Sequence, residues 1–257
     1  MRRPARQVRP EKYRFVGTFM ATLDEILAAQ RDWDLARRTG DLAAAGRART
    51  SVLIDGIRIL AGRLEGIGFP VSPVIAQPFV DVDNRIERLT KGTGVSPPEI
   101  LALIWRTLGS IALTDLQDCS HDAFWACHGL GRTQSDGFHI CGCDDPYIGA
   151  MLWEAENASD SNAPEPFCYC FSPDIHEKDN CSGGGGYLLA ADSDWAPTCI
   201  GVRWPQPSAT RTATNDPMDL LTYARTAILE CGGFPGFMGK RNFEPLRELL
   251  TRDLPVF

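Results

Sequence analysis

No stretch of this 257-residue chain approaches the roughly 18–20 consecutive apolar residues that a membrane-spanning helix requires. The first nineteen residues carry six Lys/Arg and one Glu, but no apolar segment of signal-peptide length follows them. We therefore expect a cytoplasmic protein that does not contact membranes.

Common catalytic motifs are absent as well. The sequence has no Gly-x-Ser-x-Gly nucleophile turn and no His-Glu-x-x-His metal helix. Its glycine run, 182–186, lacks the Lys-Ser/Thr that completes a phosphate-binding loop, so the run predicts a hairpin or bulge loop. These absences argue against an enzyme, and we expect no cofactor.

Basic residues are scarce in the middle of the chain. From Asp136 to Ile200 there are twelve Asp/Glu against Lys178 alone, a net charge of −11 over 65 residues, whereas the whole chain carries −7. Such a segment repels the phosphates of nucleic acid, so direct nucleic-acid binding is not expected. The segment is either a solvated face or a surface that attracts a basic protein.

The nine cysteines do not suggest a disulfide framework. Their number is odd, no secretory signal precedes them, and a chain of this length can bury a core without covalent cross-links. Reduced thiols in the cytoplasm are the simplest account.

Two helices are predicted near the N-terminus, over 22–38 and 41–66. The second has an apolar stripe with 4-3-4 spacing, formed by Leu53, Ile57, Leu60 and Leu64. The short turn at Gly40 predicts an antiparallel hairpin over 20–70 that packs on the core. Residues 1–19 are expected to be a disordered basic tail. Residues 71–80 are expected to be a Pro-rich linker, since three prolines occur in 69–79.

The remainder, 81–257, alternates between helical and strand-like patterns. Helices are predicted over 81–91, over 99–108 after Pro97-Pro98, and over 219–231 and 244–251. Short alternating segments at 137–143, 167–171, 186–191 and 199–204 predict antiparallel strands. The expected fold class is α+β, a mainly antiparallel sheet flanked by helices, with the N-terminal antiparallel helical hairpin added.

A family resemblance supports this organisation. The segment GVSPPEILALIWRTLGSIAL (94–113) resembles the leading motif of the SUKH superfamily, which includes bacterial immunity proteins that neutralise toxins. FSPDIHEKDNCSGGGGY (171–187) and CGGFPGF (231–237) are similar to segments of uncharacterised bacterial members, and the resemblance covers about 80–240. Ser96 and Glu177 depart from the pattern. The resemblance implies a SUKH-like α+β domain over 81–257 that binds proteins without a cofactor.

We therefore expect a non-enzymatic protein-binding protein, an immunity-type inhibitor that occludes a basic toxin, such as a nuclease, through an acidic surface. Exposed tryptophans are expected to anchor that surface, because aromatic side chains often dominate interfaces. The expected partner-binding residues are Asp144, Asp145, Trp153, Glu154, Glu156, Asp174, Glu177, Asp179, Asp192, Asp194 and Trp195.

Two alternatives remain. One is a small zinc- or thiol-dependent enzyme using the Cys/His set at 127–181, with Cys141, Cys143, Cys168, Cys170 and His176 as ligands. Both pairs are spaced Cys-x-Cys, however, which places two thiols on one face of a strand and favours buried structural cysteines over a zinc knuckle. The other alternative is a regulatory scaffold that binds a cellular protein.

Overall fold

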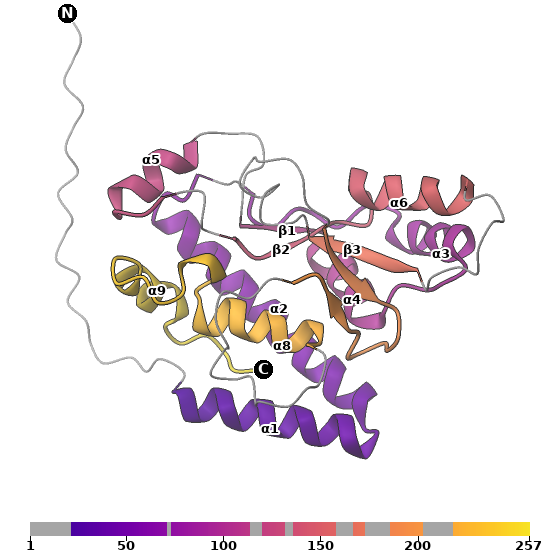
Figure 1. The fold of residues 1–257 in the computed structure, drawn as a ribbon, viewed down its shortest axis with the longest axis horizontal. Coiled ribbons are helices and arrows are strands. Elements are labelled where there is room, and N and C mark those ends of the chain that lie inside the picture. Colours follow the sequence, from indigo (N-terminus) through magenta and orange to yellow (C-terminus); the bar gives the residue numbers. More distant parts are fainter. Residues whose placement is uncertain are drawn as a thin grey trace, which may run out of the picture.

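A computed structural model describes residues 22–70, 73–113, 120–131, 136–157, 167–172, 186–202 and 218–257. In the described residues, helices surround two small antiparallel sheets (Figure 1). The expected tail, 1–19, and the glycine run, 182–186, lie outside the described residues, except for Gly186. No helix of the described segments is long and apolar enough to cross a membrane.

The N-terminal hairpin forms as predicted. Helix α1 (Leu23–Thr39) begins with a capping box between Thr22 and Glu25, and Gly40 ends it in a left-handed conformation at φ 80°. Helix α2 (Leu42–Gly66) then runs back through the centre of the molecule (Figure 1). The face that carries Leu53, Ile57 and Leu60 is buried and packs on α4, α8 and α9, which are bounded below.

Part of the expected linker is hydrogen-bonded to strand β1 (Ile111–Ala112). Ala112 donates its N–H to Val74 O (2.9 Å), and Ala76 donates to Ser110 O (3.1 Å), so 74–76 runs beside this strand. Strand β1 pairs on its other side with β2 (His139–Ile140). Residues 74–76 of this segment are therefore held against β1.

Helices α3 (Val82–Thr93) and α4 (Glu99–Leu108) follow each other and pack together. Arg106, near the end of α4, forms an ion pair of 2.8 Å with Asp83, near the start of α3, so the two helices run antiparallel. On the buried side of α4, Trp105 Nε1 donates to Cys141 O at 2.7 Å, which fixes the chain just after β2.

The second sheet has the order β3-β4-β5 and is antiparallel, with β3 (Cys168–Ser172), β4 (Tyr187–Ala190) and β5 (Cys199–Ile200). Strands β4 and β5 lie within segments predicted to be extended, and β3 ends one residue beyond the predicted segment 167–171. Helices α5 (Ser120–Cys127) and α6 (Pro146–Asn157) were not predicted; α6 packs beside α3 (Figure 1). The α+β class with its N-terminal helical hairpin is confirmed.

The C-terminal segment closes the core. Helix α8 (Leu220–Arg225) continues as a π-helical segment (η2, Thr226–Glu230), followed by a 3-10 turn (η3, Pro235–Phe237) and α9 (Glu244–Thr251). Asp219 caps α8 by accepting from Thr222 N (2.9 Å) and also accepts from Trp33 Nε1 (3.0 Å). The buried Arg225 donates to Phe257 O (2.6 Å) and to Gln30 Oε1. Hydrogen bonds thus join the hairpin to the C-terminal segment.

Candidate functional site

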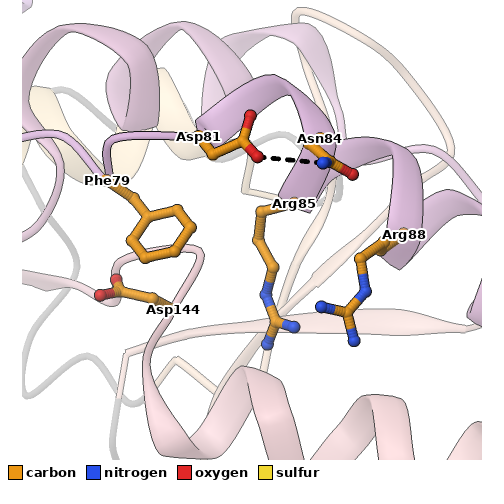
Figure 2. Close-up of a pocket in the computed structure, with 6 residues that line it drawn as sticks. All are labelled: Phe79, Asp81, Asn84, Arg85, Arg88 and Asp144. Carbon is orange, nitrogen blue, oxygen red and sulfur yellow. Dashed lines mark hydrogen bonds between the residues drawn. The ribbon is translucent and has the colours of Figure 1, made fainter.

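A pocket of about 390 Å³ lies where the chain enters α3, opposite the turn that precedes α6 (Figure 2). Its lining combines one aromatic ring, two guanidinium groups, two carboxylates and one amide. The lining residues are Phe79, Asp81, Asn84, Arg85, Arg88 and Asp144.

Helix geometry places the two arginines together. Arg85 and Arg88 are three positions apart on α3, so they project from one face, and Figure 2 shows both side chains extending in the same direction. Arg85 Nε donates to Cys143 O at 2.9 Å, which holds that side chain against the turn before α6. Asn84 Nδ2 donates to Asp81 Oδ2 at 2.9 Å on the pocket rim.

The pocket is exposed and has both signs of charge. Among the described residues, no carboxylate forms an ion pair with Arg85 or Arg88, and Arg88 is exposed. Phe79 is 41% exposed, and the adjoining Val80 is fully exposed. Aromatic residues and arginine are the types enriched at protein interfaces.

The predicted partner-binding residues have several different environments. Asp144 is exposed in the pocket, and Trp153 on α6 is 65% exposed. Asp192 and Asp194 are exposed in the turn between β4 and β5. Outside the described residues lie Asp174, Glu177 and Asp179, together with the side chains of Glu154 and Glu156.

Two of the described acids, Asp144 and Asp194, lie at different places along the α3–α4 pair. Ile100 N donates to Asp194 O (2.9 Å), which places the β4–β5 turn at the start of α4, whereas Asp83 pairs with Arg106 near the end of that helix. Ile100 and Arg106 are six residues apart on α4, which corresponds to about 9 Å along the helix axis. Asp194 is therefore near one end of the α3–α4 pair, and Asp144, in the pocket at the start of α3, is near the other.

Trp195 is not an exposed anchor. It is only 6% exposed and packs on α2, where the guanidinium of Arg47 lies 5.7 Å from its ring centroid. A Cβ at Gly46 would lie 2.5 Å from Trp195 Cβ, so this glycine allows the close approach. Trp195 joins the hairpin to the β4–β5 turn, which excludes it from a partner-facing surface.

A second group of side chains gathers behind the pocket. Ligand-type atoms of His139, Cys141 and Asp145 all lie within 4.8 Å of one another. Of the ligand set expected for a metal enzyme, only Cys141 belongs to this group. Cys143, Cys168 and Cys170 do not, and His176 lies outside the described residues.

Burial alters the acid–base chemistry around this group. It raises the pKa of the Asp145 carboxyl, an effect opposed by the hydrogen bond from Tyr147 N and reinforced by Asp144. Burial also raises the pKa of Cys143 to about 11, with a smaller contribution from Asp144. Cys143 is therefore a neutral thiol near neutral pH and a poor nucleophile.

Phe79, Arg85 and Arg88 were not predicted as site residues, and His139 was in the Cys/His set at 127–181 but not among its expected ligands. The arginines gave a usable signal, since two cations three positions apart share a helix face. His139-x-Cys141 also gave one, because alternate residues of an extended segment share a face. Asp145-Pro146 has the pattern of an N-cap followed by a first-turn proline.

Comparisons with protein-family models, with curated proteins and with solved structures find no match to this chain.

Proposed function

We propose that this protein acts by binding another protein in the cytoplasm, and that the contact surface is the pocket patch, defined as Phe79, Val80, Arg85, Arg88 and Asp144. The observation that carries the proposal is the exposed Phe79–Val80 pair beside two arginines that lack ion-pair partners among the described residues.

The chemistry of the patch suits a protein segment. Covering Phe79 and Val80 removes apolar surface from water at roughly 25 cal/mol per Å². A partner carboxylate can accept bidentate hydrogen bonds from a guanidinium. Arg85 is already held by Cys143 O, so less side-chain freedom is lost on binding. The partner segment should therefore carry an acidic residue beside an aliphatic or aromatic one.

Binding is favoured over thiol catalysis by the position of Cys141. In the part of the chain that the structure describes, it is the thiol that lies beside both an imidazole and a carboxylate, yet the residue is 0% exposed. A nucleophile must reach a substrate atom, and this sulfur has no access to one from solvent.

The SUKH resemblance supplies the partner class, a toxin domain that is neutralised by occlusion. The mixed charge of the patch changes the expected contact. Asp144 faces basic groups of the toxin and the arginines face acidic ones, in place of a uniformly acidic surface.

The test is site-specific photo-crosslinking in the native host. A photoreactive residue at position 80 should give one discrete protein adduct, which Arg85→Glu with Arg88→Glu should abolish. The control carries the same photoreactive residue at Leu35, an exposed position on the hairpin (54% exposed).

Equal yields from both positions, or an adduct that survives the double arginine reversal, would contradict the proposal. If the captured partner is toxic when expressed alone, co-expression of the wild-type chain should rescue growth and the double variant should not. Rescue by both chains would overturn the assignment of the patch.

A further inference from the structure

The group formed by His139, Cys141 and Asp145 is built from three separate local structures. His139 lies in β2, Cys141 lies two residues on in the extended chain, and Asp145 stands at the start of α6. A turn in which Asp145 N donates to Gly142 O (3.0 Å) brings the chain back. A Cβ at Gly142 would lie 2.8 Å from Asp144 Oδ1, at the end of an exposed side chain.

Hydrogen bonds that involve backbone groups fix the positions of Cys141 and Asp145. Cys141 donates its N–H to Phe171 O (2.7 Å) and accepts from Trp105 Nε1 (2.7 Å). Asp145 Oδ1 accepts from Tyr147 N (2.9 Å), the usual bond of a helix cap, which leaves Oδ2 outside that bond. Ligands held in this way are preorganised, so binding an ion requires little rearrangement.

We propose that His139, Cys141 and Asp145 bind one zinc-class transition-metal ion. The donors are one imidazole nitrogen, one sulfur and one carboxylate oxygen, and zinc takes all three types, usually with tetrahedral geometry. Magnesium and calcium prefer sites made only of oxygen, so this donor set selects against them.

The bound ion would have a structural consequence for the pocket patch. It would link β2, the turn and the start of α6, and that turn contains both Asp144 and the Cys143 carbonyl that holds Arg85. The metal site does not rest on the proposed protein binding, since either can fail without the other.

The test is titration of the full-length chain with cobalt(II), whose spectrum reports thiolate coordination. One cobalt per chain should bind, with a sulfur-to-cobalt charge-transfer band that zinc removes by displacement. Cys141→Ser should lose the band, and the matched control Cys143→Ser, a buried thiol two residues away, should keep it.

The variant Asp145→Asn tests whether a loss of metal binding is due to a lost ligand or to misfolding. Asparagine caps helices about as well as aspartate, so this variant should fold while losing the charged ligand. Its affinity for zinc should fall by at least the roughly 10- to 100-fold that loss of an outer-shell partner costs.

Three outcomes would overturn the proposal. They are a wild-type chain that binds neither cobalt nor zinc, a band that persists in Cys141→Ser, and a folded Asp145→Asn chain with undiminished zinc affinity.

Discussion

Cys127 and Cys143 show how burial changes the reactivity of a thiol. Cys127 is exposed, whereas Cys143 is 2% exposed and burial raises its pKa to about 11 from a usual 9. The thiolate is the reactive form, and each pKa unit changes its population about tenfold below the pKa.

Alkylation of the native protein at pH 8 should therefore label Cys127 rapidly. Cys143 should be labelled more slowly, by a factor of about 100 or more, as resolved by peptide mapping. The folded state favours the neutral Cys143 thiol. Its contribution to stability is thus present below pH 9 and is lost as the pH rises towards 11. Equal labelling of both thiols at pH 8 would show that Cys143 is accessible.

Gly46 and Gly62 both lie in α2, and their substitution by alanine should have opposite effects on stability. A Cβ at Gly46 would lie 2.5 Å from Trp195 Cβ, whereas nothing lies within 4 Å of one at Gly62. Gly62→Ala should stabilise the protein by up to about 1 kcal/mol through helix propensity. Gly46→Ala should destabilise it by about 1–3 kcal/mol through overpacking. Urea denaturation measures both, and a stabilising Gly46→Ala would disprove the close packing of Trp195.

Between elements, Asp219 is one of the residues that join α1 to α8. It is 1% exposed, caps α8 through Thr222, accepts from Trp33 Nε1 and lies 3.6 Å from Arg37. Asp219→Ala should lower the free energy of unfolding by about 2–4 kcal/mol, since it removes a cap and leaves the buried Trp33 N–H without its acceptor.

The control for that change is Asp55→Ala. Asp55 pairs with Arg58 on the exposed face of α2, and exposed pairs contribute at most about 1 kcal/mol. Losses of similar size in the two variants would show that the α1–α8 bond contributes little.

Elements with a clear local period were predictable from the sequence. The prediction for 99–108 coincides with α4, since Pro97-Pro98 and Gly109 bound a nearly continuous apolar run. Helix α6 was missed because its described buried side chains, Ile148 and Leu152, are few and Gly149 interrupts it. The pocket patch was missed because Arg85 and Cys143 are 58 positions apart, and only tertiary packing brings them together.

At the scale of the whole molecule, the hairpin is part of the core rather than an addition to it. Helix α2 packs on α4, α8 and α9, and its Leu53, Leu60 and Leu64 are at most 1% exposed. A chain starting at residue 71 would expose the apolar faces of all three partner helices.

We therefore expect residues 71–257 alone not to fold, and the full chain to unfold in one cooperative transition. Near-ultraviolet circular dichroism of the truncated chain and coincident denaturation curves from two probes of the full chain test these points. A truncated chain with a sharp thermal transition of its own would establish an independent domain.

The bond from Arg225 to Phe257 O has a consequence for biosynthesis. The hairpin leaves the ribosome before the other described elements, yet α8 and α9, which cover α2, come after all the described strands. Arg225 itself, 0% exposed, gains its acceptor only after residue 257 has been added. The core thus closes after translation of the whole described chain, and until then the apolar face of α2 is a substrate for chaperones.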